Sequence, residues 1–330
     1  MHVEARVCRS SRGWVGVVAV QLLICSYSNA FALDPWPTKR LSFVVAFSAG
    51  GYADTISRVI ARELGDRLKQ PVIVQNVAGA GGNTAARQIS ISSSDGYTFL
   101  VTTTGIAINE TLYKNKPFDS SQLVPVAIPI SAPEALTSNP SSGFRSLTDM
   151  LVAAKEGRAY LGTPGIGTAS HIAAEFFFKN LAKVPVKHIP FAGGTESMQA
   201  LRVGDINVRA ATVTALTIPS ITNGEIVGLA IAAEQRDSAL PNVPTFAELG
   251  YPGFFATNWV GMFARAGTPE AILNRMNIEI NAVMREPEVR KRMDALSLTI
   301  ASRDLAETNS YFKAEIGRWA TMVEASGLSR

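Results

Sequence analysis

The feature that most constrains the fold is a repeated order of short apolar strand, glycine-rich loop and amphipathic helix. Early in the chain, an apolar run at 41–47 ends in the loop 47–54, and the helix predicted over 52–69 carries its apolar residues on one face. Further strands are predicted at 72–74 and 97–101, with a second glycine loop at 78–84. Strands that alternate with helices pair in parallel through right-handed crossovers, so the pattern predicts an α/β fold.

The same order returns about 110 residues further on, as a repeat of architecture rather than of residue identity. Loops at 162–170 and 190–196 again follow short strands and precede helices. We therefore expect two similar α/β lobes with mostly parallel sheets flanked by helices, a ligand cleft between them and two hinge crossings. The expected division is 1–32 as a signal peptide, 33–133 with 255–330 as the first lobe, and 134–254 as the second. The C-terminal helices are expected to pack on the first lobe.

The first 32 residues have the pattern of a secretory signal peptide. Arg6, Arg9 and Arg12 precede an apolar run at 14–24, and Ala30-Phe31-Ala32 forms a small-residue cleavage site. The run is shorter than the ~20 residues that span a bilayer. Ile24 before Cys25 argues against a lipoprotein, and the absence of adjacent arginines argues against twin-arginine export. We predict cleavage after Ala32 and a periplasmic product.

Cleavage would change the chemistry available to the chain. Of 31 basic and 27 acidic residues, removal of 1–32 leaves 28 and 26, and both cysteines, Cys8 and Cys25, are lost. Disulfides and thiolate chemistry are thereby excluded from the expected product. The small positive excess is spread along the chain, without the Lys/Arg cluster that a nucleic-acid surface needs. No nucleic-acid partner is expected, and a monomer is the expected state.

The glycine loops are the candidate binding elements. Ligands of open parallel sheets bind beyond the carboxyl ends of the strands, where helix N-termini favour anions. Two further strand ends are rich in hydroxyl groups, at 102–104 and 212–214. Because these segments hold few Lys or Arg residues, they indicate an anion held by neutral donors.

Catalytic and metal motifs are weak. The sequence has neither a G-x-S-x-G elbow nor a Walker phosphate loop. His171 and Glu175 stand four apart on a predicted helix, but His188 is the only other histidine beyond the signal region, and zinc needs three or four ligands. We expect no catalytic residue, no cofactor and no metal. His171 is interpreted as a helix-start residue that bonds the preceding loop.

The chain resembles the Bug-type (TctC-like) substrate-binding receptors of tripartite tricarboxylate transporters. The resemblance is carried by VAFSAGGYADT (45–55), DGYTFLVTTTG (95–105), LGTPGIGTASH (161–171), IPFAGGT (189–195) and ALPNVPTFAELGYPGF (239–254). It implies a two-lobed periplasmic binding protein fold that closes on a small mono- or dicarboxylate and delivers it to membrane permease subunits, without catalysis. The alternatives are a ligand sensor for a membrane signalling protein and, less favoured, an exported hydrolase or lyase.

The resemblance also implies ligand-binding positions in both lobes. In the first lobe these are Phe47, Ser48, Ala49, Gly50, Gly51, Asp54, Thr102, Thr103 and Thr104. In the second lobe they are Thr163, Gly165, Gly167, Thr168, Ser170, His171, Phe191, Gly193 and Thr212.

Three positions depart from the family pattern. Ser48-Ala49 replaces the usual Pro-Pro, and Tyr52 stands where a small polar residue is usual. Thr212 takes the place of an acid, which argues against a ligand whose ammonium group needs a carboxylate partner. Arg209 nearby is unusual on a strand and either faces solvent or adds a cation near the cleft.

Overall fold

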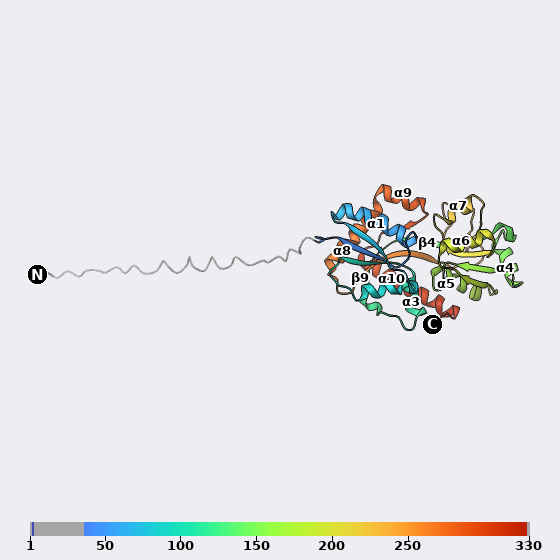
Figure 1. The fold of residues 1–330 in the computed structure, drawn as a ribbon, viewed down its shortest axis with the longest axis horizontal. Coiled ribbons are helices and arrows are strands. Elements are labelled where there is room, and N and C mark those ends of the chain that lie inside the picture. The colour runs from blue at the N-terminus through green and yellow to red at the C-terminus, as the bar shows by residue number, and fades with distance from the viewer. Residues whose placement is uncertain (1, 3–35, 329–330) are drawn as a thin grey trace. The chain divides into compact units, whose positions relative to one another are not determined.

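The computed structural model describes His2 and residues 36–328 (Figure 1). Pro37–Arg330 form one compact unit, separate from Met1–Trp36. Apart from His2, the predicted signal peptide and its cleavage site after Ala32 lie outside the described residues. Among the helices of the described part, none is long and apolar enough to cross a membrane.

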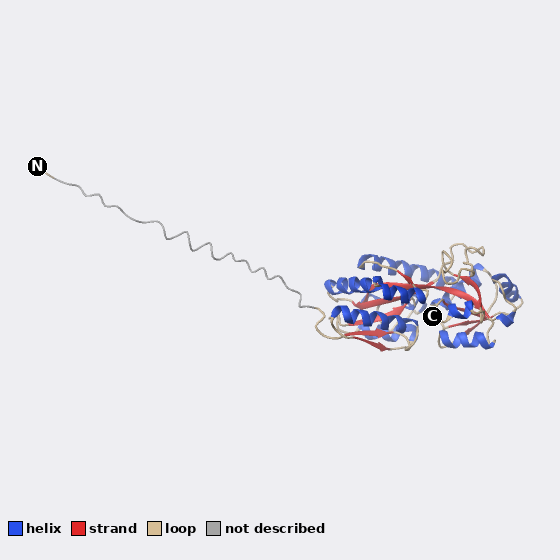
Figure 2. Cartoon of the chain, turned by 90° about the horizontal axis from the view of Figure 1, so that it is seen from above, coloured by secondary structure: helices blue, strands red, loops and turns tan. Residues whose placement is uncertain are grey.

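The strands of the described residues form one mixed sheet in the order β2-β1-β3-β9-β4-β7-β5-β6, with helices on its faces (Figure 2). The strands pair in parallel at both ends, where β1 lies between β2 and β3, and β5 lies between β6 and β7. The α/β prediction is confirmed. The strands are β1 Leu41–Val45, β2 Val72–Asn76, β3 Thr98–Thr103, β4 Leu123–Ser138, β5 Tyr160–Thr163, β6 Lys187–Pro190, β7 Val208–Thr212, β8 Val227–Ile231, β9 Thr257–Arg265 and β10 Thr299–Ile300.

The central strand β4 belongs to both ends of this sheet. Residues 123–133 pair antiparallel with β9, and residues 134–138 pair antiparallel with both β7 and β8. We call the part built on β1, β2, β3, β9 and β10 the first half, and the part built on β5 to β8 the second half. The main chain of β4 passes directly from one half into the other.

The sequence analysis did not predict β4, because Pro125, Pro129 and Pro133 interrupt its apolar run. Proline has no N–H and is normally confined to edges or bulges. The structure places register shifts between Pro125 and Ala127 and between Ala127 and Ile130, which accommodate the first two prolines. The carbonyls of Pro129 and Pro133 still accept hydrogen bonds, from the N–H groups of Ala301 and Val213.

Most helices agree with the pattern of apolar residues. The predicted ones are α1 Tyr52–Leu68, α2 Asn83–Ser90, α5 Ala169–Phe176, α6 Gly194–Val203, α8 Glu270–Arg285, α9 Pro287–Ala295 and α10 Leu305–Ser326. Those not predicted are α3 Gly105–Leu112, α4 Leu147–Lys155 and α7 Thr217–Thr222. The rigid loop at 240–244 predicts a short helix over 245–249, but the structure has a turn there, since the bond from Leu249 N–H to Phe246 O spans only three residues. A five-residue π-helical segment, Phe177–Leu181, extends α5.

The last helix, α10, contacts both halves and so reaches further than predicted. It begins at a capping box formed by Asp304 and Glu307. In the first half, Glu315 accepts a 2.8 Å hydrogen bond from the indole N–H of buried Trp259. At its other end, Lys179 and Asn180 of the second half donate to the carbonyls of Ser326 and Ala325, at 3.1 and 3.2 Å. Figure 1 shows α10 beside α3 and ending near α5.

Packing around β9 generates a test of the fold. A Cβ at Gly261 would lie 2.9 Å from Trp259 Cζ3 and 3.1 Å from carbons of Ile128 and Phe263, all buried. We expect Gly261→Ala to lower the free energy of unfolding by about 1–3 kcal/mol. Urea denaturation measures this change.

A matched glycine on α10 supplies the control. A Cβ at Gly317 would meet nothing within 4 Å, so Gly317→Ala should raise stability by about 0.5–1 kcal/mol through helix propensity. Equal effects of the two substitutions would contradict the described packing of β9.

Candidate functional site

The loop between β1 and α1 is held by Asp54. Its carboxylate accepts hydrogen bonds from Gly50 N–H at 2.8 Å, Asn76 Nδ2 at 2.9 Å and Arg58 Nε at 3.0 Å. Burial alone would raise the pKa of Asp54, but the bonds from Arg58, Gly50 and Asn76 outweigh it and hold the pKa below its ordinary value. Asp54 therefore orders the loop. The loop residues Phe47 and Gly51 are half-buried, and Ser48, Ala49 and Gly50 are exposed.

The three threonines that end β3 differ in their roles. Thr104 is buried and joins two strands, because its hydroxyl accepts from Trp259 N–H at 2.9 Å and donates to Thr257 O at 3.3 Å. Thr102 is buried beside the start of α2, since a Cβ at Gly82 would lie 3.3 Å from its Oγ1. Thr103 is half-buried. These positions bring the ends of β1 and β3 together with the glycine loop at 78–84.

In the second half, the loop between β5 and α5 is fixed by its own side chains. Thr168 caps α5 by accepting from His171 N–H at 3.2 Å, and it donates to Gly165 O at 2.8 Å. Gly167 has a φ of +80°, and a Cβ there would lie 2.8 Å from Leu112 Cδ2 at the end of α3. Only glycine suits this position, where the second half touches the first.

The loop after β6 leads into α6 without a side-chain cap. Gly193 is the N-cap residue in extended conformation, and half-buried Phe191 lies against the backbone near Gly162. Arg209 is buried at 3% exposure and donates to Ser197 Oγ at 3.0 Å and to Gly194 O at 3.2 Å. Of the two interpretations of Arg209, the one facing solvent is therefore wrong. Burial lowers its pKa to about 10, although Glu134 acts in the opposite direction.

The sequence analysis missed the acid at the junction of the two halves, Glu134 on β4. It is 4% exposed and lies opposite Thr212 in the ladder between β4 and β7. Ser170 Oγ donates to Glu134 Oε2 at 2.7 Å, and Thr212 Oγ1 donates to Glu134 Oε1 at 2.9 Å. Asn258 Nδ2 donates to Thr212 Oγ1 at 3.1 Å. We call these four residues the Glu134 cluster.

The surroundings of Glu134 disfavour its charge. A small cavity beside Glu134 and Ser170 has apolar walls that include Phe177, Phe246 and Phe254. Burial raises the pKa of Glu134 from 4.5 to about 7, against the hydrogen bonds from Ser170 and Thr212 and the charge of Arg209. Burial and the nearby Glu134 also raise the pKa of Tyr52.

A chain of hydrogen bonds runs from the first half into the second and includes two of the predicted site residues, Thr212 and Ser170. From α1, the Tyr52 hydroxyl donates to Asn258 O at 3.2 Å, and Asn258 continues through the Glu134 cluster to Ser170 on α5. His171, the next residue on α5, accepts a hydrogen bond at Nδ1 from Gly167 N–H at 3.2 Å. Gly167 lies in the loop that contacts α3. The predicted positions at these contacts, Thr212, Ser170, His171 and Gly167, all lie in the second half. Their first-half partners, Asn258 and Leu112, were not predicted as site residues.

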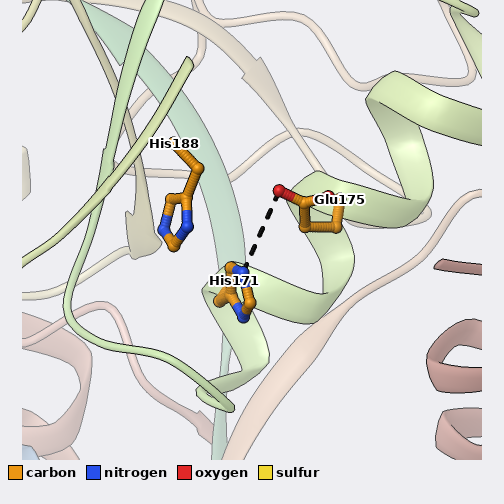
Figure 3. A group of neighbouring side chains, drawn as sticks. All are labelled: His171, Glu175 and His188. Atoms are coloured by element: carbon orange, nitrogen blue, oxygen red, sulfur yellow. Dashed lines mark ion pairs between the residues drawn. The ribbon is translucent and has the colours of Figure 1, made fainter. Parts of the chain in front are cut away.

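His171, Glu175 and His188 lie together although they come from two elements (Figure 3). His188 is the only other histidine beyond the signal region, and the fold brings it to His171 and Glu175, with the two imidazole rings stacked at 4.2 Å between centroids. Their candidate ligand atoms lie within 4.8 Å of one another.

The hydrogen bonds of this cluster do not suit a metal. His171 Nδ1 accepts from Gly167, so the proton of the neutral ring sits on Nε2, which faces Glu175 at 3.9 Å. Stacked rings direct their lone pairs side by side rather than toward one point. Glu175 is already paired with Lys179 at 2.7 Å, and His188 Nε2 bonds Thr163 Oγ1 at 2.7 Å. The cluster instead fixes the loop at 163–168 to α5 and β6.

The fold and the arrangement of the loops define a periplasmic-binding-protein-like α/β protein. Residues 56–328 match the family described as "Tripartite tricarboxylate transporter family receptor". The chain belongs to this family. It is 30% identical over 319 residues to Protein BugT of Bordetella pertussis, with 95% of this chain and 97% of the relative covered.

Two solved structures carry carboxylates. One, of 26% identity and TM-score 0.83, is titled "R. palustris Rpa4515 with adipate" and covers 89% of this chain and 99% of its own. The other is MatC (Rpa3494) from Rhodopseudomonas palustris with bound malate, at 28% identity and TM-score 0.79, covering 87% and 99%. The periplasmic binding protein BugD is similar at 25% identity and TM-score 0.80, covering 89% and 99%.

Glu134 generates a prediction about stability and pH. Between pH 4.5 and 7 the unfolded chain has released this proton while the folded chain keeps it, so stability falls as the pH rises through that window. Between pH 4.5 and 7, the free energy of unfolding of the wild-type protein should fall by about 3 kcal/mol relative to that of Glu134→Gln. Urea unfolding of both proteins at pH 5, 6, 7 and 8 measures the difference, and a constant difference would contradict the raised pKa.

The histidine cluster generates a second prediction. Because His171 Nδ1 and His188 Nε2 are engaged in hydrogen bonds and the Glu175 carboxylate in an ion pair, zinc at micromolar concentration should not stabilise the wild-type protein more than a His188→Gln variant. Differential scanning fluorimetry with and without zinc checks this expectation. A saturable stabilisation lost in His188→Gln would show that the cluster binds metal after all.

Proposed function

We propose that this protein is a periplasmic solute-binding receptor that closes on a small carboxylate and delivers it to a tripartite tricarboxylate-type permease. Membership of the receptor family over residues 56–328 is the observation that carries the proposal. The relatives solved with adipate and malate support a carboxylate ligand. Under this proposal the sequence before Leu33 is a signal peptide removed on export, and the protein binds its ligand as a monomer.

The ligand contacts proposed here are neutral donors at helix starts. The helices α1, α2 and α6 follow the glycines Gly51, Gly82 and Gly193, and none of the three has a side-chain cap. Their first N–H groups and helix dipoles favour an anion. A site without a buried ion pair suits a ligand that must be released.

The proposed lobes are residues 33–133 with 255–330, and residues 134–254. The main chain of β4 crosses from one to the other at residues 133 and 134, and Glu134 N–H bonds Ala256 O beside the return crossing into β9. Two adjacent crossing segments are the arrangement of a hinge.

An exported hydrolase or lyase is disfavoured by the engagement of its candidate bases. His171 and His188, the histidines of the compact unit, bond Gly167 and Thr163 and stack on each other. Asp54 has its carboxylate occupied by Gly50, Asn76 and Arg58.

Ligand-induced stabilisation tests the proposal. The chain from Leu33, refolded to remove carried-over ligand, is heated with small carboxylates, amino acids and sugars. A carboxylate at 100 times its Kd should stabilise by about 2.7 kcal/mol. Stabilisation by sugars alone, or by none of the panel at millimolar concentration, would contradict a carboxylate receptor.

A charge placed at the start of α6 sharpens the test. A Cβ at Gly193 would lie 2.8 Å from Glu196 Oε2, the flexible end of a side chain that can move aside. Aspartate is a good N-cap residue and Gly193 is extended, so Gly193→Asp should keep the fold while repelling an anionic ligand. We expect its affinity to fall at least tenfold below that of Gly193→Asn, which caps without charge. Calorimetric titration measures both, and equal affinities would place the ligand away from α6.

A further inference from the structure

Both hydroxyl groups of the Glu134 cluster already donate their hydrogens to the Glu134 carboxylate. Ser170 and Thr212 each carry one hydroxyl hydrogen, and each donates it to a different oxygen of Glu134, at 2.7 and 2.9 Å. Toward a ligand, these two oxygens can therefore only accept while Glu134 is ionised.

Asn258 adds a further acceptor beside them. Its Nδ2 is used by the bond to Thr212 Oγ1, whereas its Oδ1 is buried without a hydrogen-bond partner among the described residues. A buried acceptor without a donor is energetically unfavourable, so this oxygen favours a donor from outside the chain. Arg209, the nearby cation, directs its hydrogen bonds to Ser197 and Gly194 instead.

We propose that the Glu134 cluster is a subsite that accepts a hydrogen bond from a hydroxyl or ammonium group of the carboxylate ligand. This inference rests on the proposed function and names the ligand class, which is a hydroxy- or amino-substituted carboxylic acid. Thr212 stands where relatives often have an acid, and Glu134 brings a carboxylate to the same place from the neighbouring strand. The expected argument against an ammonium group therefore does not hold for this chain.

Matched sets of ligands test the subsite. Binding of succinate, malate and aspartate, and of propionate, lactate and alanine, is measured by calorimetric titration at pH 8, where Glu134 is ionised. Within at least one set, the hydroxyl or amino member should bind about tenfold more tightly than the unsubstituted acid.

Variants then assign that preference to the cluster. In Glu134→Gln the amide donates a hydrogen bond to one of the two hydroxyl oxygens. The hydrogen of that hydroxyl then becomes free to point at the ligand, so the ratio of the affinities for the substituted and unsubstituted acids should fall toward one. Thr212→Val, which removes an acceptor without changing charge, should reduce it as well. Thr308→Val is the matched control, because Thr308 is buried on α10 with a hydroxyl that has no hydrogen-bond partner among the described residues. The ligand preference of this variant should equal that of the wild-type protein. In Glu134→Gln, a larger loss of affinity for the amino than for the hydroxyl member would identify an ammonium group as the partner, and a larger loss for the hydroxyl member would identify a hydroxyl group.

The outcomes separate the two proposals. If no carboxylate of any set binds, the proposed receptor function fails. If carboxylates bind but the unsubstituted acids bind equally well or better, the receptor function stands and the subsite is overturned. A preference that survives both Glu134→Gln and Thr212→Val also overturns it. Should Glu134→Gln not fold, as judged by circular dichroism, Thr212→Val alone decides.

Discussion

The continuous ladder along β4 is the constraint on which the rest of the structure depends. One strand of 16 residues hydrogen-bonds to β9 over its first part and to β7 and β8 over its last part. Because backbone hydrogen bonds fix register, the strands at both ends of the sheet are placed relative to this one segment. The carboxyl ends of β1 and β3, and those of β5 and β7, are thereby held around the same point of the chain.

At that point the protein buries a carboxylate rather than an apolar side chain. Burying an acid is unfavourable unless its oxygens are hydrogen-bonded, and Glu134 has one hydroxyl partner for each oxygen. The same bonds connect β4 to α5 and to β7. A substitution at Glu134 is therefore expected to affect the contacts of β4 with α5 and β7 as well as the proposed subsite.

Local patterns predicted the glycine loops, most crossover helices and the parallel pairings, because each depends on neighbouring residues. The resemblance predicted Ser170, His171 and Thr212 as site residues. In the structure, Ser170 and Thr212 both bond Glu134, and His171 bonds Gly167. Glu134 could not be found this way, since its partners lie 36 and 78 residues away and it sits in a proline-interrupted run. The contact between His171 and His188 could not be predicted for the same reason, because only the fold stacks the two rings. Three prolines interrupt the apolar pattern of β4, and the first two are accommodated by register shifts that no local pattern reveals.

The path of α10 has a consequence for how the molecule unfolds. Its middle is bonded to Trp259 in the first half, and its last carbonyls accept hydrogen bonds from Lys179 and Asn180 in the second half. Neither half can lose its structure without exposing apolar residues of α10, such as Trp319 and Val323, that are buried in the shared core. We therefore expect heat denaturation to follow a single cooperative transition, and a ligand bound to one half to protect the backbone amides of the other.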